Sequence, residues 1–200
     1  GSVNGAERAR ASTSPDGINW TYQPGFQALR DVSPTLSPYF ALWTGQGFVV
    51  GGVAGGGFSP FLATSADGVA WTLYDSVIYG LDTGYSNTLY CGVAVGTQVV
   101  IGGGSGFIAV ASRSNLSSWT WKPFLRDSTS FGTSIVYQLF YYEGYLVAVS
   151  SSSNKCAVST DVATTWVYPT GSTSLSGVLG TSSTVTSGCS SPFGLVVCST

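Results

Sequence analysis

Few side chains in this chain of 200 residues can act as acids, bases, nucleophiles or metal ligands. Charged residues make up 8% of the sequence and histidine is absent, which removes the side chain used most often as a general base or a metal ligand. The four cysteines include no Cys-x-x-Cys pair, the spacing typical of a redox or zinc motif. We therefore expect no cofactor, no metal ion and no catalytic residue.

The carboxylates give no enzyme-like arrangement. Glu143 follows Tyr141 and Tyr142 in a predicted turn, and a glycosidase would need a second carboxylate facing it across the scissile bond. The spacing of the sequence nominates no such partner, so we interpret Glu143 as a solvated turn residue. Seven Lys and Arg against nine Asp and Glu give a net charge of −2, which excludes the basic surface of a nucleic-acid-binding protein.

A repeat organises the whole chain. Tryptophans at positions 20, 71, 119 and 166 are separated by 51, 48 and 47 residues. Each ends a short polar segment, and three of these segments contain Ser-x-Asp: Ser14–Trp20, Ser65–Trp71 and Ser159–Trp166. We call these three segments the Asp turns. In the remaining segment, Ser112–Trp119, Ser114 stands where aspartate is expected.

The polar residues of the Asp turns are typical of a structural role. An aspartate in a tight turn accepts hydrogen bonds from backbone N–H groups about two residues further on, and we favour this interpretation over calcium binding. The tryptophan that ends each segment has a large apolar body that must be covered, so we expect it to pack between neighbouring sheets. The residues assigned to these structural positions are Ser14, Asp16, Trp20, Ser65, Asp67, Trp71, Trp119, Ser159, Asp161 and Trp166.

A second landmark recurs with the same period. Tight turns, each followed by an apolar run, are predicted at 44–47, 95–98, 141–144 and 191–194. Turns of this kind between β-rich runs are hairpin signals. Each repeat therefore reads as strand, turn, strand, link, strand, Asp turn and strand, which is one four-stranded antiparallel blade of a β-propeller. No stretch shows helical periodicity flanked by caps.

The two ends of the chain together supply one more repeat. The last predicted turn ends at Gly194, and the segment before Trp20 provides the missing half of its blade. We predict an all-β fold with a single small propeller of four four-stranded blades, closed by pairing of the N- and C-terminal strands so that few sheet edges are exposed. The alternative is half of an eight-blade ring made by two chains. Residues 1–2 are interpreted as a tag remnant, and the blades cover about 37–75, 87–123, 134–169, and 185–200 joined with 8–23.

The Asp turns resemble the Asp-box, Ser-x-Asp-x-Gly-x-Thr-Trp, of sialidase-type propellers and of many phage and secreted repeat proteins. Asp161 to Trp166 keeps the family spacing with Ala163 in place of glycine, whereas the turns of Asp16 and Asp67 are one residue shorter. The resemblance implies a propeller fold. It implies little about function, because the Asp-box lies away from the active sites of the family. A sialidase would also need three arginines that grip a carboxylate, and three of the five arginines here fall at or near predicted outer strands.

The links between predicted blades are polar and contain aromatic residues, and loops on a rigid scaffold commonly carry binding residues. Leu-Arg-Asp occurs in two of these links, at 29–31 and 125–127. It reads either as an exposed ion pair of small energetic value or as a repeated polar contact. The candidate ligand-binding residues in the links are Phe26, Arg30, Tyr79, Tyr85, Arg126 and Phe131.

The cysteines are expected to be structural. Cys156, Cys189 and Cys198 align with small or apolar residues of the other repeats, and Cys91 lies on a predicted inner strand. Buried free thiols are therefore the simplest expectation, although the sequence alone leaves the disulfide state open.

Together these features predict a non-catalytic binding or structural module that recognises a surface glycan or a host or virion protein. A composition rich in Gly, Ser, Thr and aromatics without His or Met resembles that of phage fibres and other virion appendages, which implies a virion or extracellular location. A sialidase-like glycan-processing enzyme and a purely architectural cap or spacer are the alternatives. No apolar run approaches the roughly 20 residues of a membrane helix, and a homo-oligomer could form through further parts of a longer protein.

Overall fold

The chain is described by a computed structural model over residues 9–32, 36–54, 59–75, 88–122, 125, 131, 134–151, 154–171, 174–180 and 184–200. Its strands form five antiparallel sheets of two to four strands each, so the predicted all-β fold class is confirmed. Within these residues, no helix has the length and apolar character needed to cross a bilayer.

Two complete repeats form four-stranded sheets in which the strand order follows the chain. Unit I consists of β3 (Ser37–Trp43), β4 (Phe48–Ala54), β5 (Ser59–Ser65) and β6 (Thr72–Asp75). Unit II consists of β7 (Leu89–Val95), β8 (Gln98–Gly103), β9 (Ile108–Ser112) and β10 (Asn115–Trp121). Valine, isoleucine and aromatic residues are frequent in these strands, as expected for half-buried pleated surfaces. All eight strands fall within the ranges predicted for two of the blades.

The other repeats are shorter. Unit III consists of β11 (Val136–Tyr142), β12 (Tyr145–Ser150) and β13 (Cys156–Ser159), and a single bridge between Val158 and Val167 stands in the place of its fourth strand. The C-terminal hairpin consists of β14 (Val185–Ser191) and β15 (Gly194–Ser199), and the N-terminal hairpin of β1 (Ala11–Thr13) and β2 (Thr21–Gln23). The two hairpins match the first and the second half of a repeat.

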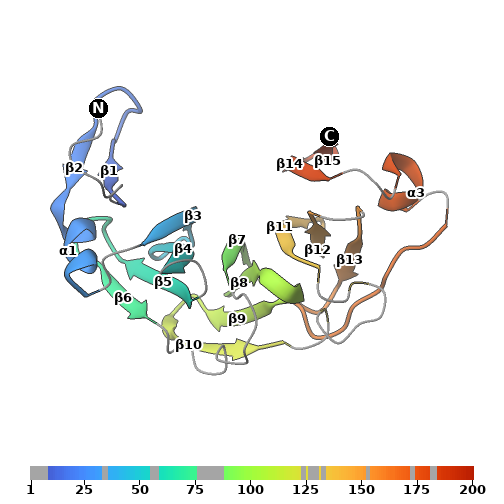
Figure 1. The fold of residues 1–200 in the computed structure, drawn as a ribbon, viewed down its shortest axis with the longest axis horizontal. Coiled ribbons are helices and arrows are strands. Elements are labelled where there is room, and N and C mark those ends of the chain that lie inside the picture. Colours follow the sequence, from blue (N-terminus) through green and yellow to red (C-terminus); the bar gives the residue numbers. More distant parts are fainter. Residues whose placement is uncertain are drawn as a thin grey trace.

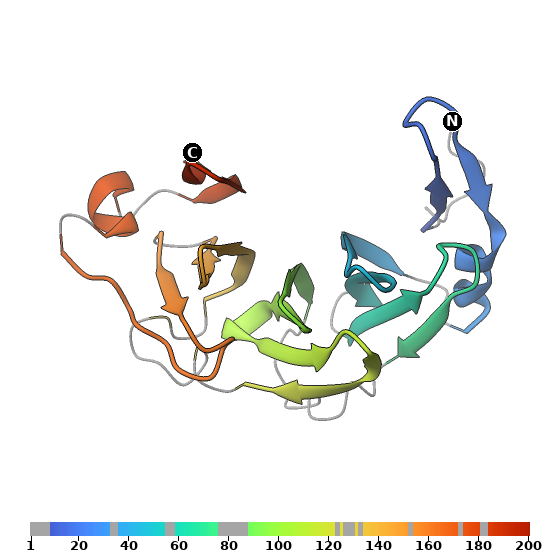
Figure 2. The same ribbon diagram turned by 180° about the vertical axis from the view of Figure 1, so that it is seen from behind.

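The sheets stand side by side in an open arc, which Figures 1 and 2 show from opposite sides. The first strands of successive repeats, which we call the inner strands, neighbour one another along the concave side: β3, β7, β11 and β14. The two terminal hairpins remain separate two-stranded sheets at opposite ends of the arc. The predicted pairing of the terminal strands is therefore absent from the described residues, and the arc does not close into the predicted four-blade ring.

Apolar clusters fill the space between neighbouring units. Val49 and Leu62 of unit I pack with Ile101 of unit II, and all three are fully buried. A second cluster lies between units II and III, a third between the N-terminal hairpin and unit I, and a fourth between unit III and the C-terminal hairpin. Because burying one such side chain contributes about 1.5–3 kcal/mol, these clusters fix each unit against the next.

Two of the links contain short helices, contrary to the prediction that the links are loops. Helix α1 (Pro24–Val32) joins β2 to β3, and α3 (Leu175–Leu179) precedes β14. Helix α1 begins at a proline, whose fixed φ suits the first helical position, and it buries Phe26 and Leu29 against unit I. This pair lies three residues apart, which is too short a pattern to announce a helix. A single 3₁₀ turn, η1 (Gly104–Gly106), connects β8 to β9.

Glycines on the inner strands make room for phenylalanine rings beneath the concave surface. A Cβ atom added at Gly92 of β7 would lie 2.8 Å from the ring of Phe40, and one added at Gly188 of β14 would lie 2.7 Å from the ring of Phe140. Both positions therefore require a residue without a Cβ. The two rings belong to the pocket described next.

Candidate functional site

The four inner strands each carry a β-bulge at an equivalent place. The pairing register shifts at Tyr39 in β3, Tyr90 in β7, Tyr137 in β11 and Thr186 in β14. A bulge leaves one residue without a partner on the next strand and redirects its side chain. The residue before the bulge is fully buried in three of the four strands: Leu89, Val136 and Val185. In these three strands, a buried residue fixes the backbone immediately before the bulge, and the bulged residue falls outside the regular alternation of side chains along the strand.

Three of the four bulged residues form a continuous row of rings. The ring centroids of Tyr39 and Tyr90 are 5.3 Å apart at an interplanar angle of 44°. Those of Tyr90 and Tyr137 are 5.9 Å apart at 41°. These separations lie in the range in which aromatic pairs attract one another. We call these three residues the tyrosine row, and its first member, Tyr39, is 54% exposed.

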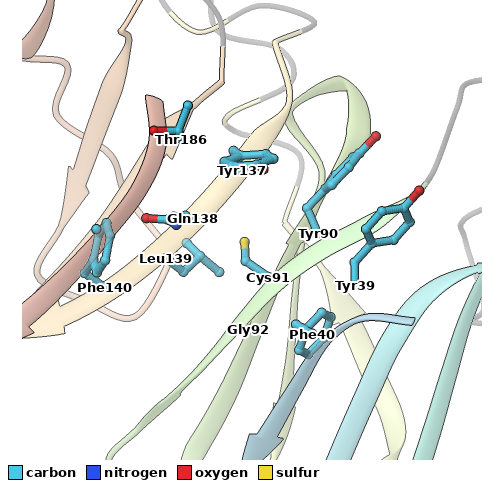
Figure 3. A pocket seen from close by; sticks show the side chains of 11 residues that line it. Tyr39, Phe40, Tyr90, Cys91, Gly92, Tyr137, Gln138, Leu139, Phe140 and Thr186 are labelled. Atoms are coloured by element: carbon cyan, nitrogen blue, oxygen red, sulfur yellow. The ribbon is translucent and has the colours of Figure 1, made fainter. Parts of the chain in front are cut away.

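The tyrosine row borders a pocket of about 340 Å³ on the concave side, shown in Figure 3. Its three rings come from three different units, and Thr186 of the C-terminal hairpin occupies the corresponding place at the far side. Every described residue that lines the pocket is uncharged. Besides the row and Thr186, the lining consists of Phe40, Cys91, Gly92, Gln138, Leu139, Phe140 and Gly188.

Two polar side chains in the pocket indicate what chemistry it can support. Within the described part of the chain, the buried Oε1 atom of Gln138 has no hydrogen-bond partner, so a rotation of this side chain that brings its amide to the pocket surface would break no side-chain hydrogen bond of Oε1. The thiol of Cys91 donates a long hydrogen bond to the carbonyl oxygen of Val136, at 3.5 Å, and burial raises the pKa of this thiol. A thiol that stays protonated is a poor nucleophile, so the pocket is suited to stacking and hydrogen bonding.

The Asp turns form the hydrogen-bond network that the sequence predicted. Asp161 Oδ1 accepts the backbone N–H groups of Thr164 at 3.2 Å and Thr165 at 2.8 Å, and Asp16 and Asp67 accept the equivalent pairs. These donors, foremost the N–H of Thr165, lower the pKa of Asp161 to about 2. Backbone N–H donors likewise hold the pKa of Asp16 and Asp67 below the usual value. The carboxylates thus organise the turns by accepting hydrogen bonds.

The tryptophans of the repeats pack between units, with one exception. Trp71, Trp119 and Trp166 are half-buried in the clusters that separate successive units, as predicted. Trp20 is 64% exposed, so the prediction is wrong for this residue. Its indole N–H still donates to the carbonyl oxygen of Gly17, and what it lacks is a preceding unit, because it lies in the hairpin that ends the arc.

Of the ligand-binding residues predicted in the links, the structure describes the side chains of Phe26 and Phe131 only, and neither lines this pocket. Phe26 and Phe131 are 2% and 0% exposed and belong to apolar clusters, so neither presents a ring to solvent. Arg30 lies in α1, but its side chain is outside the described residues, as are Tyr79, Tyr85 and Arg126. We therefore do not carry these positions forward as a binding surface.

The cysteines and Glu143 have the structural settings of ordinary side chains. All four cysteines are free; Cys91 is buried and Cys156 half-buried, but Cys189 and Cys198 are exposed. The prediction of burial is wrong for the last two because they lie in the C-terminal hairpin, which has a neighbouring unit on one side only. Glu143 is exposed in its turn, as expected. Among the residues that the structure describes, no three His, Cys, Asp or Glu side chains are placed to share a metal ion.

The tyrosine row was not identified from the sequence, although its signal was present. Tyr39, Tyr90 and Tyr137 are separated by 51 and 47 residues, and Thr186 follows 49 residues later. This is the spacing of the tryptophans, but the tyrosines fall at the start of each inner strand, where the register shift hides their orientation. No protein-family model and no curated protein matches this sequence.

Proposed function

We propose that this chain is a non-catalytic binding module of the β-propeller type, and that its tyrosine row binds a neutral surface glycan. The observation that carries the proposal is the row itself. Equivalent bulges on successive inner strands place one exposed and two half-buried tyrosine rings along a pocket of about 340 Å³ whose described lining is uncharged. A bulge interrupts the strand pairing. A tyrosine that served only to fill the core could be accommodated in a regular strand without this interruption.

The chemistry of the pocket matches that of a neutral sugar. The CH faces of a pyranose ring are apolar and stack on aromatic rings, whereas its hydroxyls need hydrogen-bond partners. The tyrosine row offers the stacking surface, and the side chains of Gln138 and Thr186 offer polar groups at its edge. Pockets of this type, mainly aromatic with a few polar groups, are the usual form of small-ligand sites. An acidic sugar would lose hydration here without gaining a cationic partner.

The repeat architecture supports the propeller assignment. The inner strands stand side by side and the tryptophans of the repeats lie between units. The resemblance of the Asp turns to the Asp-box supports, by analogy of fold alone, the proposal that the module belongs to a virion appendage or an extracellular protein. The sialidase-like alternative would need two facing carboxylates and an arginine cluster, and the eleven described residues that line this pocket include neither residue type.

Removal of the central ring tests the proposal. Tyr90 contacts both other members of the row, so Tyr90→Ala interrupts the stacking surface. The wild-type chain is first screened on a glycan array, and the best neutral oligosaccharide is then titrated by calorimetry. We expect Tyr90→Ala to weaken binding about tenfold or more, which corresponds to about 1.4 kcal/mol. Raising the salt concentration should leave the affinity unchanged, because no charged group takes part.

Tyr145 provides the matched control. It lies on β12, is 49% exposed and is not part of the pocket lining, so Tyr145→Ala should bind as the wild type does. Equal losses for the two variants would contradict a role for the tyrosine row. Failure of the wild type to bind any neutral glycan would also contradict the proposal and would favour a purely architectural role.

A further inference from the structure

The two ends of the arc are complementary halves of one repeat. In units I, II and III the second strand pairs with the third, as β4 does with β5, β8 with β9 and β12 with β13. Among the described residues, β15 pairs only with β14 and β1 only with β2. These two strands occupy the second and third positions of a repeat. In a complete repeat, a strand in the position of β15 would pair with a strand in the position of β1. Each of these two strands therefore has an edge that the other could cover.

In the half of the repeat that carries the tryptophan, side chains at both ends of the arc also lack a packing partner. Trp20 of the N-terminal hairpin is 64% exposed, whereas its counterparts are half-buried against the preceding unit. In unit I this contact is made by α1, where Phe26 packs edge-on against Trp71 with ring centroids 5.0 Å apart. At the other end of the arc, Val178 of α3 is 70% exposed. Trp20 lacks a preceding helix, and α3 lacks a following tryptophan.

The inner half shows a matching groove and a matching surface. A groove of about 430 Å³ beside the N-terminal hairpin is lined by residues of β1 and β3 together with Trp71. It lies on the side of β3 where, in the other units, the preceding inner strand packs. On β15, Leu195 and Val197 pack toward unit III, so Val196 between them faces the other way. Val196 is 57% exposed, whereas Val100 at the corresponding place in β8 is fully buried between units.

We propose that the C-terminal hairpin of a second copy of this chain occupies this groove, with β15 of one copy paired to β1 of the other. The chain's own two ends lie apart at opposite ends of the arc (Figure 2), so they do not satisfy one another. A second copy related by a two-fold axis offers its C-terminal end to the first copy's N-terminal end, and the reverse, so both junctions are identical and no edge remains open. The product is a ring of eight repeats from two chains, with both tyrosine rows on its inner side.

The mass of the protein in solution tests the proposal independently of glycan binding. By light scattering at micromolar concentration, the full chain is expected at twice its 20.7 kDa mass. Trp20→Ser removes an apolar contact at both junctions and should shift the mass to that of one chain. Because Trp20 is exposed in the single chain, the circular dichroism spectrum should not change. Tyr145→Ser, at a tyrosine that is 49% exposed on β12 and lines neither pocket, is the matched control and should retain the two-chain mass.

Each other outcome of this measurement would overturn the proposal. A wild-type mass of one chain would show that the ends do not associate, or that the chain closes on itself. A continuous series of larger masses would show that the junctions propagate into a filament instead of closing a ring. Dissociation of the Tyr145 variant to the same extent as the Trp20 variant would show that the contact does not lie at the junction.

An engineered disulfide between β15 and β1 shows whether the two strands that pair belong to the same chain or to two copies. In unit II, Gln98 lies opposite Ser112. If the same register applies with Gly194 opposite Ser14, then Cys198 lies opposite Arg10; the register of unit III places Ala11 there instead. Opposite residues of antiparallel strands have the Cα spacing that a disulfide needs. The variants Arg10→Cys and Ala11→Cys are therefore oxidised in a Cys189→Ser background.

The expected product is a two-chain band on a non-reducing gel, from at least one of the two variants. The band should disappear on reduction and should not form when Cys198→Ser is added. A disulfide within one chain would show that β15 pairs with its own β1 and would overturn the proposal. Absence of a disulfide in both registers would overturn it as well.

Discussion

The inner strands and the Asp turns repeat with the same period. They differ in how many of their hydrogen-bonding groups and aromatic rings have partners inside the molecule. In the Asp turns, Asp161 accepts two backbone N–H groups and the hydroxyls of Ser159 and Thr165, and the tryptophans of the interior repeats are half-covered by apolar neighbours. On the inner strands, the bulges break the strand pairing and leave tyrosine rings along an open pocket.

This contrast separates two roles within one repeat. A group whose hydrogen bonds and contacts are satisfied inside the molecule contributes to stability. An aromatic ring that borders an open pocket keeps part of its surface uncovered, and that part remains available for contact with a ligand. Under the proposed function, the outer half of each repeat is scaffold and the inner half is the binding surface. Substitutions in the outer half should accordingly change the free energy of unfolding, and substitutions in the inner half should change the affinity for the ligand.

The largest effect is expected on the outer side. Trp119 packs in the cluster between units I and II, and its indole N–H donates to the carbonyl oxygen of Leu116 at 2.8 Å. Trp119→Ala leaves a cavity in that cluster and should lower the free energy of unfolding by about 3 kcal/mol, with a fall in Tm of about 9 °C. Trp43→Ala, at an exposed ring on β3, should cost less than about 1 kcal/mol. Equal losses in thermal unfolding would remove the distinction between the two sides.

The outer side was also the part of the fold that the sequence revealed. The spacing of Trp20, Trp71 and Trp119 gave the period, and the polar residues before each tryptophan gave the turn, because both features depend on local chemistry. The strands of units I and II follow from these two signals. The helix at α1 did not, because its buried face consists of Phe26 and Leu29 alone. The separation of the two terminal hairpins depends on the angle between successive units, which local pattern does not encode.

The candidate site was harder to predict for a different reason. Aromatic residues in links look exposed in the sequence, yet Phe26 and Phe131 are buried because each packs into an apolar cluster between units. Tyrosines within strands look like core residues, yet the bulge at Tyr90 interrupts the regular alternation of the strand, and its half-buried ring lines the pocket. A bulge is a property of the pairing between two strands, so the sequence of one strand alone does not predict it. Aligning the repeats on their inner strands as well as on their tryptophans would have revealed the tyrosine row.

A gain of affinity is expected if the row is extended on the inner side. The fourth inner strand carries Thr186 at its bulge, so Thr186→Tyr would add one ring to the row. We expect the affinity for the neutral oligosaccharide to rise about fivefold, since one additional aromatic contact contributes about 1 kcal/mol. Ser187→Tyr, one residue further along the same strand and off the bulge, should leave the affinity unchanged in the same titration. An equal gain from both variants would mean that the position of the ring is unimportant.

The smallest effect concerns the acid dependence of the outer turns. Hydrogen bonds from the backbone, foremost from Thr165, lower the pKa of Asp161 from 3.8 to about 2. Because the folded state holds this proton more weakly than the unfolded state, the carboxylate stabilises the fold fully above pH 3.8 and loses this contribution as the pH falls toward about 2. Asp161→Asn should therefore lower Tm by a few degrees at pH 7, and its Tm should approach that of the wild type between pH 4 and pH 2. A difference in Tm that stays constant over this interval would show that the charge of Asp161 does not stabilise the turn.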